Sequence, residues 1–238
     1  MTQRLDYYIS DFDGISSRNI AQQLIKAGKI SVDGRIITKS SFQVDDGMTV
    51  TRLQEHLYVG RAALKLKAFL EEFSVDISGK DALDVGSSTG GFTEILLEND
   101  VKSVICVDVG RDQLHDRIRS DKRVTSIEEQ DIRTFQSEPF ELLTCDVSFI
   151  SLHHILESLD RLSSDALVIL FKPQFEVGQE VKRNRAGVVQ DDKAIAISLE
   201  RFEDATQLLG WDLVKKMPSL IEGKEGNREY FYYFKKRH

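Results

Sequence analysis

Hydrophobic residues follow different patterns in the first fifty residues and in the rest of the chain. Near the N-terminus, apolar residues recur at helical spacing between Ser17, a favourable helix N-cap, and Gly28, a favourable helix end. Segment 29–39 then carries strand-forming residues on both sides of Asp33-Gly34, the preferred two-residue hairpin turn. The pattern predicts two short helices and a small β unit. Such a unit buries little surface, so we expect it to contact another element or a ligand.

From about residue 59 onward, helical and strand patterns alternate, beginning with an amphipathic helix expected over 59–73. Strands are then expected over 81–86, 103–109, 124–129, 142–148, 166–171, 212–218 and 229–236, and helices over 91–99, 113–120, 152–162 and 193–209. This alternation predicts an α/β domain with a doubly wound, mostly parallel sheet. We therefore expect an α+β domain over 1–52, a linker over 53–58 and the α/β domain over 59–238.

Composition limits where the protein works and what it binds. The longest apolar run, Ala166 to Phe171, is far shorter than the roughly 20 residues that a membrane span needs. The N-terminus lacks the apolar segment of a secretory signal, and Cys106 and Cys145 have no CxxC spacing. These features indicate a cytoplasmic protein with reduced thiols and without a metal site. The net charge of −7 argues against non-specific coating of nucleic acid but leaves a local RNA-binding face open.

Candidate chemistry lies at the ends of the predicted strands, because ligands of doubly wound sheets bind outside the carboxyl ends of the strands. After the first strand, "LDVGSSTGGFTE" has glycines that allow a close approach to a ligand ahead of a helix. Asp108 ends the second strand, 22 residues after Gly86, where an acidic residue commonly binds two ribose hydroxyls. A plain tight turn and a capping aspartate are the alternatives. Asp131-Ile132 could bind an adenine amino group and ring, and Asp146 follows the fourth strand.

Lys172 directly follows the six-residue apolar strand and precedes Pro173. A lysine there could simply extend to water at the edge of the sheet. Its place after a strand, in line with Asp146 and the glycine turn, favours a catalytic group instead. Pro173 is interpreted as the residue that stops the strand.

The N-terminal stretch "SSRNIAQQLIKAGKISVDGRIITKSSFQV" resembles the S-four-type RNA-binding module first described in a ribosomal protein. The resemblance implies an RNA-binding face, for which the candidate residues are Arg18, Lys26, Lys29, Arg35 and Lys39. A dimerisation or capping unit is the alternative.

The motifs "DVGSSTGGFTE", "VICVDVG", "CDVSFISL", "LFKPQFEVG" and "GNREYF" resemble FtsJ-like methyltransferases, which have a Rossmann-like fold and use S-adenosylmethionine. More closely, the chain resembles the TlyA family of ribosomal RNA 2′-O-methyltransferases. The resemblance implies a catalytic tetrad of Lys65, Asp146, Lys172 and Glu229. It also implies cofactor binding by Gly86, Ser87, Ser88, Gly90, Gly91, Phe92, Asp108, Asp131, Ile132 and Asp146. Two departures are Gly60, where the broader class usually has Ser, and Phe92, where it often has Trp.

The implied reaction methylates a ribose 2′-hydroxyl of a cytidine in 23S rRNA and possibly one in 16S rRNA. We expect Lys172 to accept the proton or to activate the acceptor, with burial and the charge of Lys65 favouring its neutral amine. Asp146 would position Lys172 and face the sulfonium, and Glu229 would orient the hydroxyl. Lys182, Arg183 and Arg185, in the loop after the catalytic strand, are a candidate phosphate clamp, or simply a solvated loop. We expect a monomer that binds ribosomal RNA or ribosomal subunits.

Three other functions stay open from the sequence. Members of the resembled family have also been described as haemolysins, although no segment here is suited to membrane insertion. A non-catalytic, RNA-binding ribosome assembly factor could retain the fold. A base or small-molecule methyltransferase would not need the paired lysines.

Overall fold

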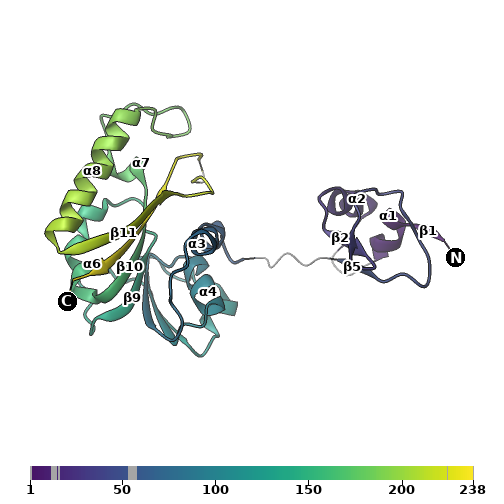
Figure 1. Cartoon of the computed structure of the whole chain (residues 1–238), viewed down its shortest axis with the longest axis horizontal. Coiled ribbons are helices and arrows are strands. Elements are labelled where there is room, and N and C mark those ends of the chain that lie inside the picture. The colour runs from purple at the N-terminus through teal and green to yellow at the C-terminus, as the bar shows by residue number, and fades with distance from the viewer. Residues whose placement is uncertain (1, 12–14, 16, 53–57, 224, 238) are drawn as a thin grey trace. The chain divides into compact units, whose positions relative to one another are not determined.

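The computed structural model describes residues 2–11, 15, 17–52, 58–223 and 225–237, and it divides the chain into two compact units, Met1–Leu57 and Tyr58–His238 (Figure 1). The predicted linker 53–58 lies outside the described residues except for Tyr58. Among the described residues, no helix is long and apolar enough to cross a membrane.

The small unit contains short helices and two small sheets. Its elements are β1 (Gln3–Arg4), α1 (Leu5–Tyr8), a 3₁₀ turn (Ile9–Asp11), α2 (Arg18–Lys26), β2 (Ile30–Val32), β3 (Arg35–Ile36), β4 (Gln43–Val44) and β5 (Val50–Arg52). As predicted, Ser17 caps α2, because its side chain accepts a hydrogen bond from the amide of Ile20. The predicted hairpin is also present, with Asp33 and Gly34 both at positive φ between β2 and β3.

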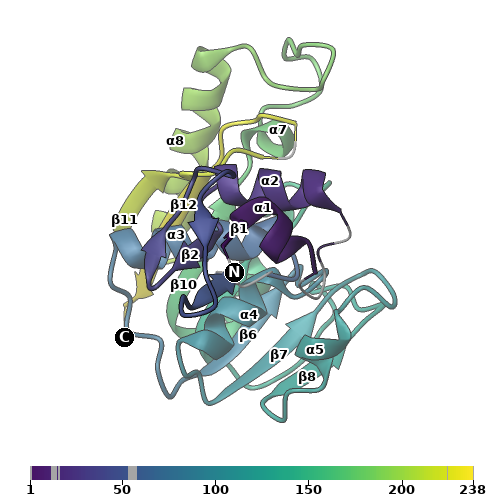
Figure 2. The ribbon, with the colours of Figure 1, turned by 90° about the vertical axis from the view of Figure 1, so that its right-hand side faces the viewer.

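The large unit is built on a seven-stranded sheet with the order β11-β12-β10-β9-β6-β7-β8. Its strands are β6 (Asp81–Val85), β7 (Ser103–Val107), β8 (Val124–Ile127), β9 (Phe140–Cys145), β10 (Ser163–Phe171), β11 (Trp211–Pro218) and β12 (Tyr230–Lys236). Strands β6 to β10 pair in parallel, and β12 and β11 add antiparallel strands at one edge. This confirms the predicted mostly parallel, doubly wound fold, of which Figure 2 shows β6, β7 and β8 in succession.

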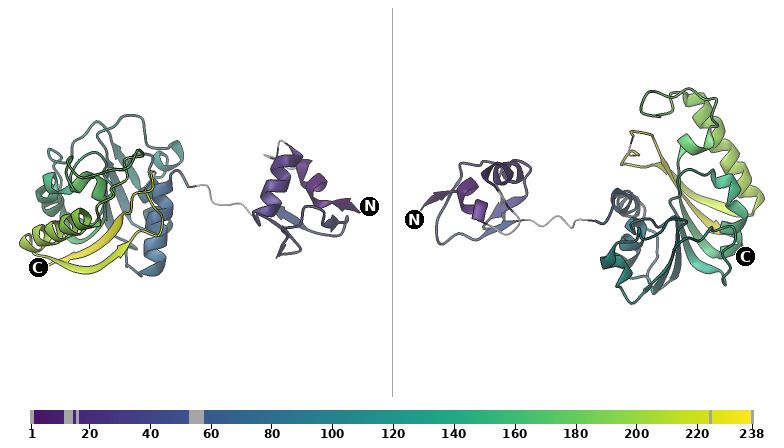
Figure 3. Two further views of the ribbon diagram at one scale, coloured as in Figure 1. Left: turned by 90° about the horizontal axis from the view of Figure 1, so that it is seen from above. Right: turned by 180° about the vertical axis from the view of Figure 1, so that it is seen from behind.

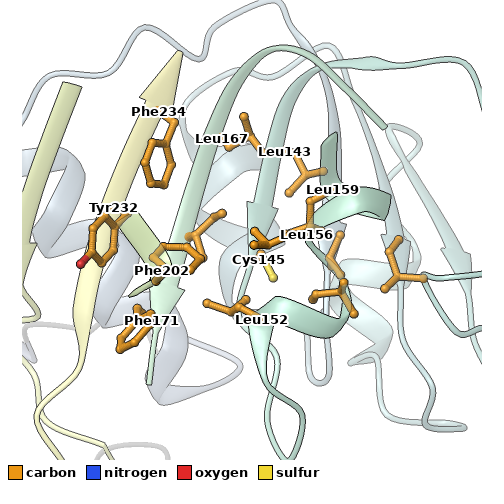
Figure 4. Packing of buried hydrophobic residues seen from close by; sticks show 14 of the residues in the cluster. Leu143, Cys145, Leu152, Leu156, Leu159, Leu167, Phe171, Phe202, Tyr232 and Phe234 are labelled. Atoms are coloured by element: carbon orange, nitrogen blue, oxygen red, sulfur yellow. The ribbon is translucent and has the colours of Figure 1, made fainter. Parts of the chain in front are cut away.

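Helices cover both faces of this sheet. They are α3 (Arg61–Glu72), α4 (Gly91–Glu98), α5 (Asp116–Arg119), α6 (Leu156–Leu162), α7 (Pro173–Glu176) and α8 (Asp192–Leu208), with a 3₁₀ turn at Leu152–His154. Helices α3 and α4 share one hydrophobic core with the sheet, and α6 and α8 share the other. Figure 4 shows side chains of the core that contains α6 and α8. Helix α8 packs beside β11, where the green helix and the yellow strands lie together in Figure 3.

The apolar run of β10 is explained by its central place in the sheet. Leu167, Ile169 and Phe171 point into the core with α6 and α8. Alternate residues, among them Val168 and Leu170, point into the core with α3 and α4. A strand segment that is buried on both faces needs apolar residues at every position, which is why no polar residue interrupts the run from Ala166 to Phe171.

The helix predictions were wrong in three places. The helix expected over 113–120 is only the four-residue α5, and the helix expected over 152–162 is divided into a 3₁₀ turn and α6. Pro173 follows the end of β10 but also occupies the first position of α7, a helix that the sequence pattern did not predict. Proline suits that position because the first helical N–H has no intrahelical partner.

Candidate active site

The strand order reverses beside β6. The chain runs from β6 outward through β7 and β8, and then returns to place β9 on the other side of β6. A cavity of about 520 Å³ lies at the carboxyl ends of these strands, a size suited to a small-molecule cofactor. Its lining residues are Val85, Gly86, Ser88, Val107, Asp108, Val109, Gln113, Gln130, Asp131, Ile132, Arg133, Asp146, Val147, Ser148, Phe149, Ile150 and Ile155.

The glycine turn after β6 brings the backbone against Asp146, which follows the neighbouring strand β9. Gly86 has a φ of +77°, and a Cβ there would lie 3.0 Å from the carbonyl oxygen of Asp146. A side chain at this position would therefore be strained and would crowd the cavity wall. This geometry is consistent with the expectation that glycine here allows a tight turn and a close approach to a ligand.

Asp108 is held at the cavity by two backbone amides. Its carboxylate accepts hydrogen bonds from the amide of Ser88, at 2.8 Å, and from the amide of Gly110, at 2.7 Å. These bonds fix the carboxylate while leaving lone pairs on both oxygens, since each carboxylate oxygen can accept more than one hydrogen bond. The fixed acceptors suit the hydroxyls of a ribose.

Asp131 and Ile132 also line the cavity, as expected from the sequence. Arg133 pairs with Asp131 at 2.6 Å, and this hydrogen bond holds the pKa of the Asp131 carboxyl below its usual value. The side chain of Ile132 is buried and supplies an apolar surface. Arg133 was not predicted from the sequence, although its place two residues after Asp131 could have suggested it.

Four of the expected cofactor residues do not line this cavity: Ser87, Gly90, Gly91 and Phe92. Gly90 instead is the N-cap of α4, with a φ of +93°, and Gly91, the first residue of α4, packs tightly against α3. Phe92 points into the core with α3 and α4, where its ring stacks on Phe231. Gly90, Gly91 and Phe92 therefore form the start of α4 and its packing against α3 and the sheet. The sequence could not separate the two roles because all of these residues belong to one contiguous motif.

Lys172 lies beside the cavity in a buried ion pair. Its ammonium contacts Asp146 Oδ1 at 2.7 Å and donates a hydrogen bond to Ser148 Oγ at 2.8 Å. The side chains of Lys172 and Asp146 are only 10% and 13% exposed. Since Asp146 and Ser148 line the cavity, Lys172 is attached directly to its wall. Ser148 was not predicted, although it lies in the same "DVSFIS" motif as Asp146.

Lys65 and Glu229 form a second buried ion pair. Lys65 Nζ lies 2.6 Å from Glu229 Oε2, and Gln174 donates a longer hydrogen bond of 3.4 Å to Glu229 Oε1. A Cβ at Gly223 would lie 2.6 Å from that same oxygen, so a larger residue there would displace the carboxylate from this position. The charge of Lys65 is thus compensated by a carboxylate. We expected this charge to favour the neutral amine of Lys172, and the carboxylate weakens that effect.

A buried polar cluster supports the strand that carries the glycine turn. Asp84 is fully buried and accepts hydrogen bonds from the hydroxyls of Thr93 and Thr144 at 2.6 and 2.8 Å. Burial raises the pKa of Asp84 to about 6. Cys106, which contacts Thr93, and Cys145 are both buried, and burial raises the pKa of the Cys106 thiol to about 12. Neither thiol is suited to act as a nucleophile.

In the small unit, Arg18 has a structural partner. Its guanidinium donates to the buried Asp6 and to the hydroxyl of Tyr7, and it lies over the Tyr7 ring at 3.9 Å. Asp6 also accepts hydrogen bonds from Arg4 and Gln22. The other candidate RNA-binding residues are exposed at Lys26, Arg35 and Lys39 and half-buried at Lys29. Arg18 therefore stabilises the fold of the small unit, whereas Lys26, Arg35 and Lys39 are accessible.

The three residues of the candidate phosphate clamp, in the loop after α7, have different environments. Arg183 donates hydrogen bonds to the backbone carbonyls of Gln174, Gly178, Gln179 and Val181, so its guanidinium braces the loop. Lys182 and Arg185 are exposed. Within the residues that the structure covers, no group of His, Cys, Asp and Glu is arranged to hold a metal ion.

Comparison with known families decides how this arrangement is classified. Residues 58–236 match the family described as FtsJ-like methyltransferase, and residues 3–50 match the S4 domain. A Campylobacter jejuni protein named 23S rRNA (cytidine-2′-O)-methyltransferase TlyA is 45% identical, covering 97% of this chain and 98% of its own. The chain is an FtsJ-like methyltransferase of the TlyA family. The matched ranges also coincide with the two compact units of the structure.

Two further curated proteins and one solved structure are also similar to this chain. The Mycobacterium tuberculosis 16S/23S rRNA (cytidine-2′-O)-methyltransferase TlyA is 39% identical over 92% of this chain and 84% of its own. Hemolysin A of Brachyspira hyodysenteriae is 34% identical over 97% of this chain and 99% of its own. A solved structure from Streptococcus thermophilus, with 32% identity and a TM-score of 0.71, covers 99% of this chain and 88% of that chain.

Proposed function

We propose that this chain transfers a methyl group from S-adenosylmethionine to the ribose 2′-hydroxyl of a cytidine in ribosomal RNA. The observation that carries the proposal is the buried pair of Lys172 and Asp146 on the wall of a cavity that suits a nucleoside cofactor. Relatives named as rRNA (cytidine-2′-O)-methyltransferases align over nearly the whole chain, which supports this choice of substrate.

The cavity residues fit S-adenosylmethionine by their chemistry. Asp108 offers fixed acceptors for the two ribose hydroxyls, and Asp131 offers an acceptor for the adenine amino group. Ile132 supplies an apolar surface for the adenine ring, and the bare backbone at Gly86 admits the rest of the cofactor. Asp146 places a negative charge where the positive sulfonium would lie.

The bound cofactor supplies a methyl group activated by its positive sulfur. Transfer would join this methyl carbon to the ribose 2′-oxygen and leave S-adenosylhomocysteine as the product. Lys172 would accept the proton of the 2′-hydroxyl as a neutral amine, after its own ammonium proton has passed to the Asp146 carboxylate with which it is paired. Holding the hydroxyl in line with the methyl group supplies much of the acceleration.

Lys65 and Glu229 act in this proposal by placing the acceptor. Their pair is buried and lies next to the segment of Lys172, because Gln174 bonds Glu229. Glu229 accepts a hydrogen bond from the ribose, and Lys65 holds Glu229 in position. Both residues thus complete the tetrad implied by the family.

The small unit and the exposed cations of the loop bind the RNA. Lys26, Arg35, Lys39, Lys182 and Arg185 are accessible for phosphate contacts. Binding through phosphates releases counterions, so RNA affinity falls steeply with salt despite the acidic net charge. RNA binding by the small unit is supported by its match to the S4 domain.

The decisive experiment maps 2′-O-methyl groups on ribosomal RNA from cells with and without this protein. It is paired with transfer of labelled methyl by the purified chain to naked RNA, isolated small subunits and isolated large subunits. We expect 2′-O-methylcytidine at one or two positions. A label on a base would contradict the proposal in favour of a base methyltransferase. Cofactor binding without any transfer would favour an assembly factor, and leakage of protein-free vesicles on addition of the chain would favour a cytolysin.

A further inference from the structure

Two motifs meet through several contacts beside the candidate catalytic lysine. One is segment 146–152, which follows β9, and the other is segment 172–177, which follows β10. At one end, Lys172 bonds Asp146 and Ser148. At the other end, Glu176 accepts hydrogen bonds from the hydroxyl of Ser151, at 2.6 Å, and from the amide of Leu152, at 2.8 Å.

These contacts close a ring through the backbone. Lys172 is the N-cap of α7, and Glu176 lies in the single turn of that helix, with Phe175 N donating to Lys172 O at 2.9 Å. Pro173 fixes the first backbone dihedral of the turn. The distance from Lys172 to Glu176 is therefore set by helix geometry, and movement at one end is transmitted to the other.

The segment that Glu176 holds is strained. Phe149 has a φ of +66°, a conformation that a bulky side chain rarely adopts, and its side chain is 92% exposed. Such strain persists only where surrounding contacts enforce it. Phe149 is not fixed by burial. Its ring contacts Phe175 of the other segment, with centroids 5.4 Å apart, and the hydrogen bonds at Ser148 and Ser151 hold the backbone on both sides of it.

We propose that Glu176 is a positioning residue that holds segment 147–152 so that the Ser148 hydroxyl and Asp146 carboxylate meet Lys172. The carboxylate of Glu176 satisfies the amide of Leu152, at the start of the 3₁₀ turn, and the hydroxyl of Ser151, its N-cap. Without these bonds the strained segment relaxes and Ser148 leaves the lysine. This role rests on the proposed methyl transfer, because the effect of losing Glu176 is measured as a change in the kcat of that reaction.

The test compares Glu176→Ala with Glu176→Gln, which keeps an acceptor for the Leu152 amide. Glu157→Ala, an exposed glutamate at the start of the nearby α6, is the matched control. Hydrogen exchange at the Leu152 amide measures the hold on the segment independently of activity. Steady-state kinetics with ribosomal RNA as substrate measure its consequence as separate changes in kcat and KM.

For Glu176→Ala we expect at least tenfold faster exchange of the Leu152 amide and at least a tenfold lower kcat, with KM for the RNA within threefold of wild type. Glu176→Gln should keep kcat within threefold of wild type, and Glu157→Ala should match wild type in both measurements. A wild-type kcat in Glu176→Ala, or unchanged exchange at Leu152, would overturn the proposal. Should Glu176→Ala not fold, Ser151→Ala takes its place, with a lowered kcat supporting the proposal and an unchanged one overturning it. An inactive wild-type chain would instead refute the proposed function.

Discussion

Lys65 on α3 and Glu229 immediately before β12 are separated by 164 residues in the chain and form one ion pair with Nζ and Oε2 2.6 Å apart. Their side chains are 9% and 3% exposed. An ion pair this deeply buried gains little over a matched apolar pair, but removing one partner leaves an uncompensated charge. The fold thus retains an arrangement that is hard to explain by stability alone, which supports a role in the proposed reaction.

Glu229→Gln should lower the free energy of unfolding of the large unit by about 3 kcal/mol, because it leaves the buried Lys65 without a counter-charge. Lys65→Met combined with Glu229→Gln should recover most of that loss while methyl transfer stays low. Urea denaturation of the three proteins measures the first quantity, and transfer of labelled methyl measures the second. Full activity in the double variant would show that the pair serves stability only.

Asp108→Ala should weaken binding of S-adenosylmethionine by about tenfold to a hundredfold, because a lost buried hydrogen bond to each ribose hydroxyl costs about 1 kcal/mol or more. Loss of the bonds from Ser88 and Gly110 would also release the glycine turn. Isothermal titration calorimetry checks the value, with Asp204→Asn, an exposed residue of α8, as the control. Equal affinity in Asp108→Ala and in the control would remove Asp108 from the cofactor site.

Asp84 should make stability depend on pH in an unusual direction. Burial raises its pKa from 3.8 to about 6, so the folded chain binds this proton more tightly than the unfolded chain does. The stabilising contribution is therefore complete below about pH 4 and is lost as the pH rises to about 6, and it amounts to about 3 kcal/mol. As the pH falls from 7 to 4, the unfolding free energy of wild type should increase by about 3 kcal/mol relative to that of Asp84→Asn. A constant difference across this range would contradict the assignment.

Substitution of Arg18 should affect stability and substitution of Lys26 should affect RNA binding, although both are basic residues of α2. Arg18→Met should destabilise the small unit by about 1 kcal/mol, because it removes two charge-assisted hydrogen bonds from the buried Asp6. Lys26→Met should leave stability unchanged, weaken RNA binding and reduce its salt dependence by the equivalent of about one phosphate contact. Hydrogen exchange of the α2 amides and filter binding at several salt concentrations separate the two effects. A loss of stability in Lys26→Met would count against this division of roles.

Much of this architecture could be predicted because it follows local rules. The helix capped by Ser17, the hairpin at Asp33-Gly34 and the doubly buried strand β10 each follow from propensity and hydrophobic period. The rule that ligands bind at the carboxyl ends of the strands also predicted Asp108, Asp131 and Asp146, all of which line the cavity.

The partners of the charged side chains could not be predicted, because they depend on contacts between distant segments. The carboxylate beside Lys65, the hydroxyl beside Lys172 and the carbonyls around Arg183 come from loops whose conformation has no periodic signal. Arg18 was expected at an RNA face for the same reason, since its bond to Asp6 joins two helices. Likewise, the inward orientation of Phe92 depends on how α4 packs against the sheet.

The central claim is tested most directly by Lys172→Met, which keeps the length of the side chain and removes its charge. Lys193→Met, at the exposed start of α8, is the matched control. Methyl transfer to ribosomal RNA and binding of S-adenosylmethionine are measured on the same preparations. We predict that Lys172→Met loses transfer by at least a thousandfold while its cofactor affinity stays within tenfold of wild type. Transfer by Lys172→Met at a rate near that of wild type would contradict the account.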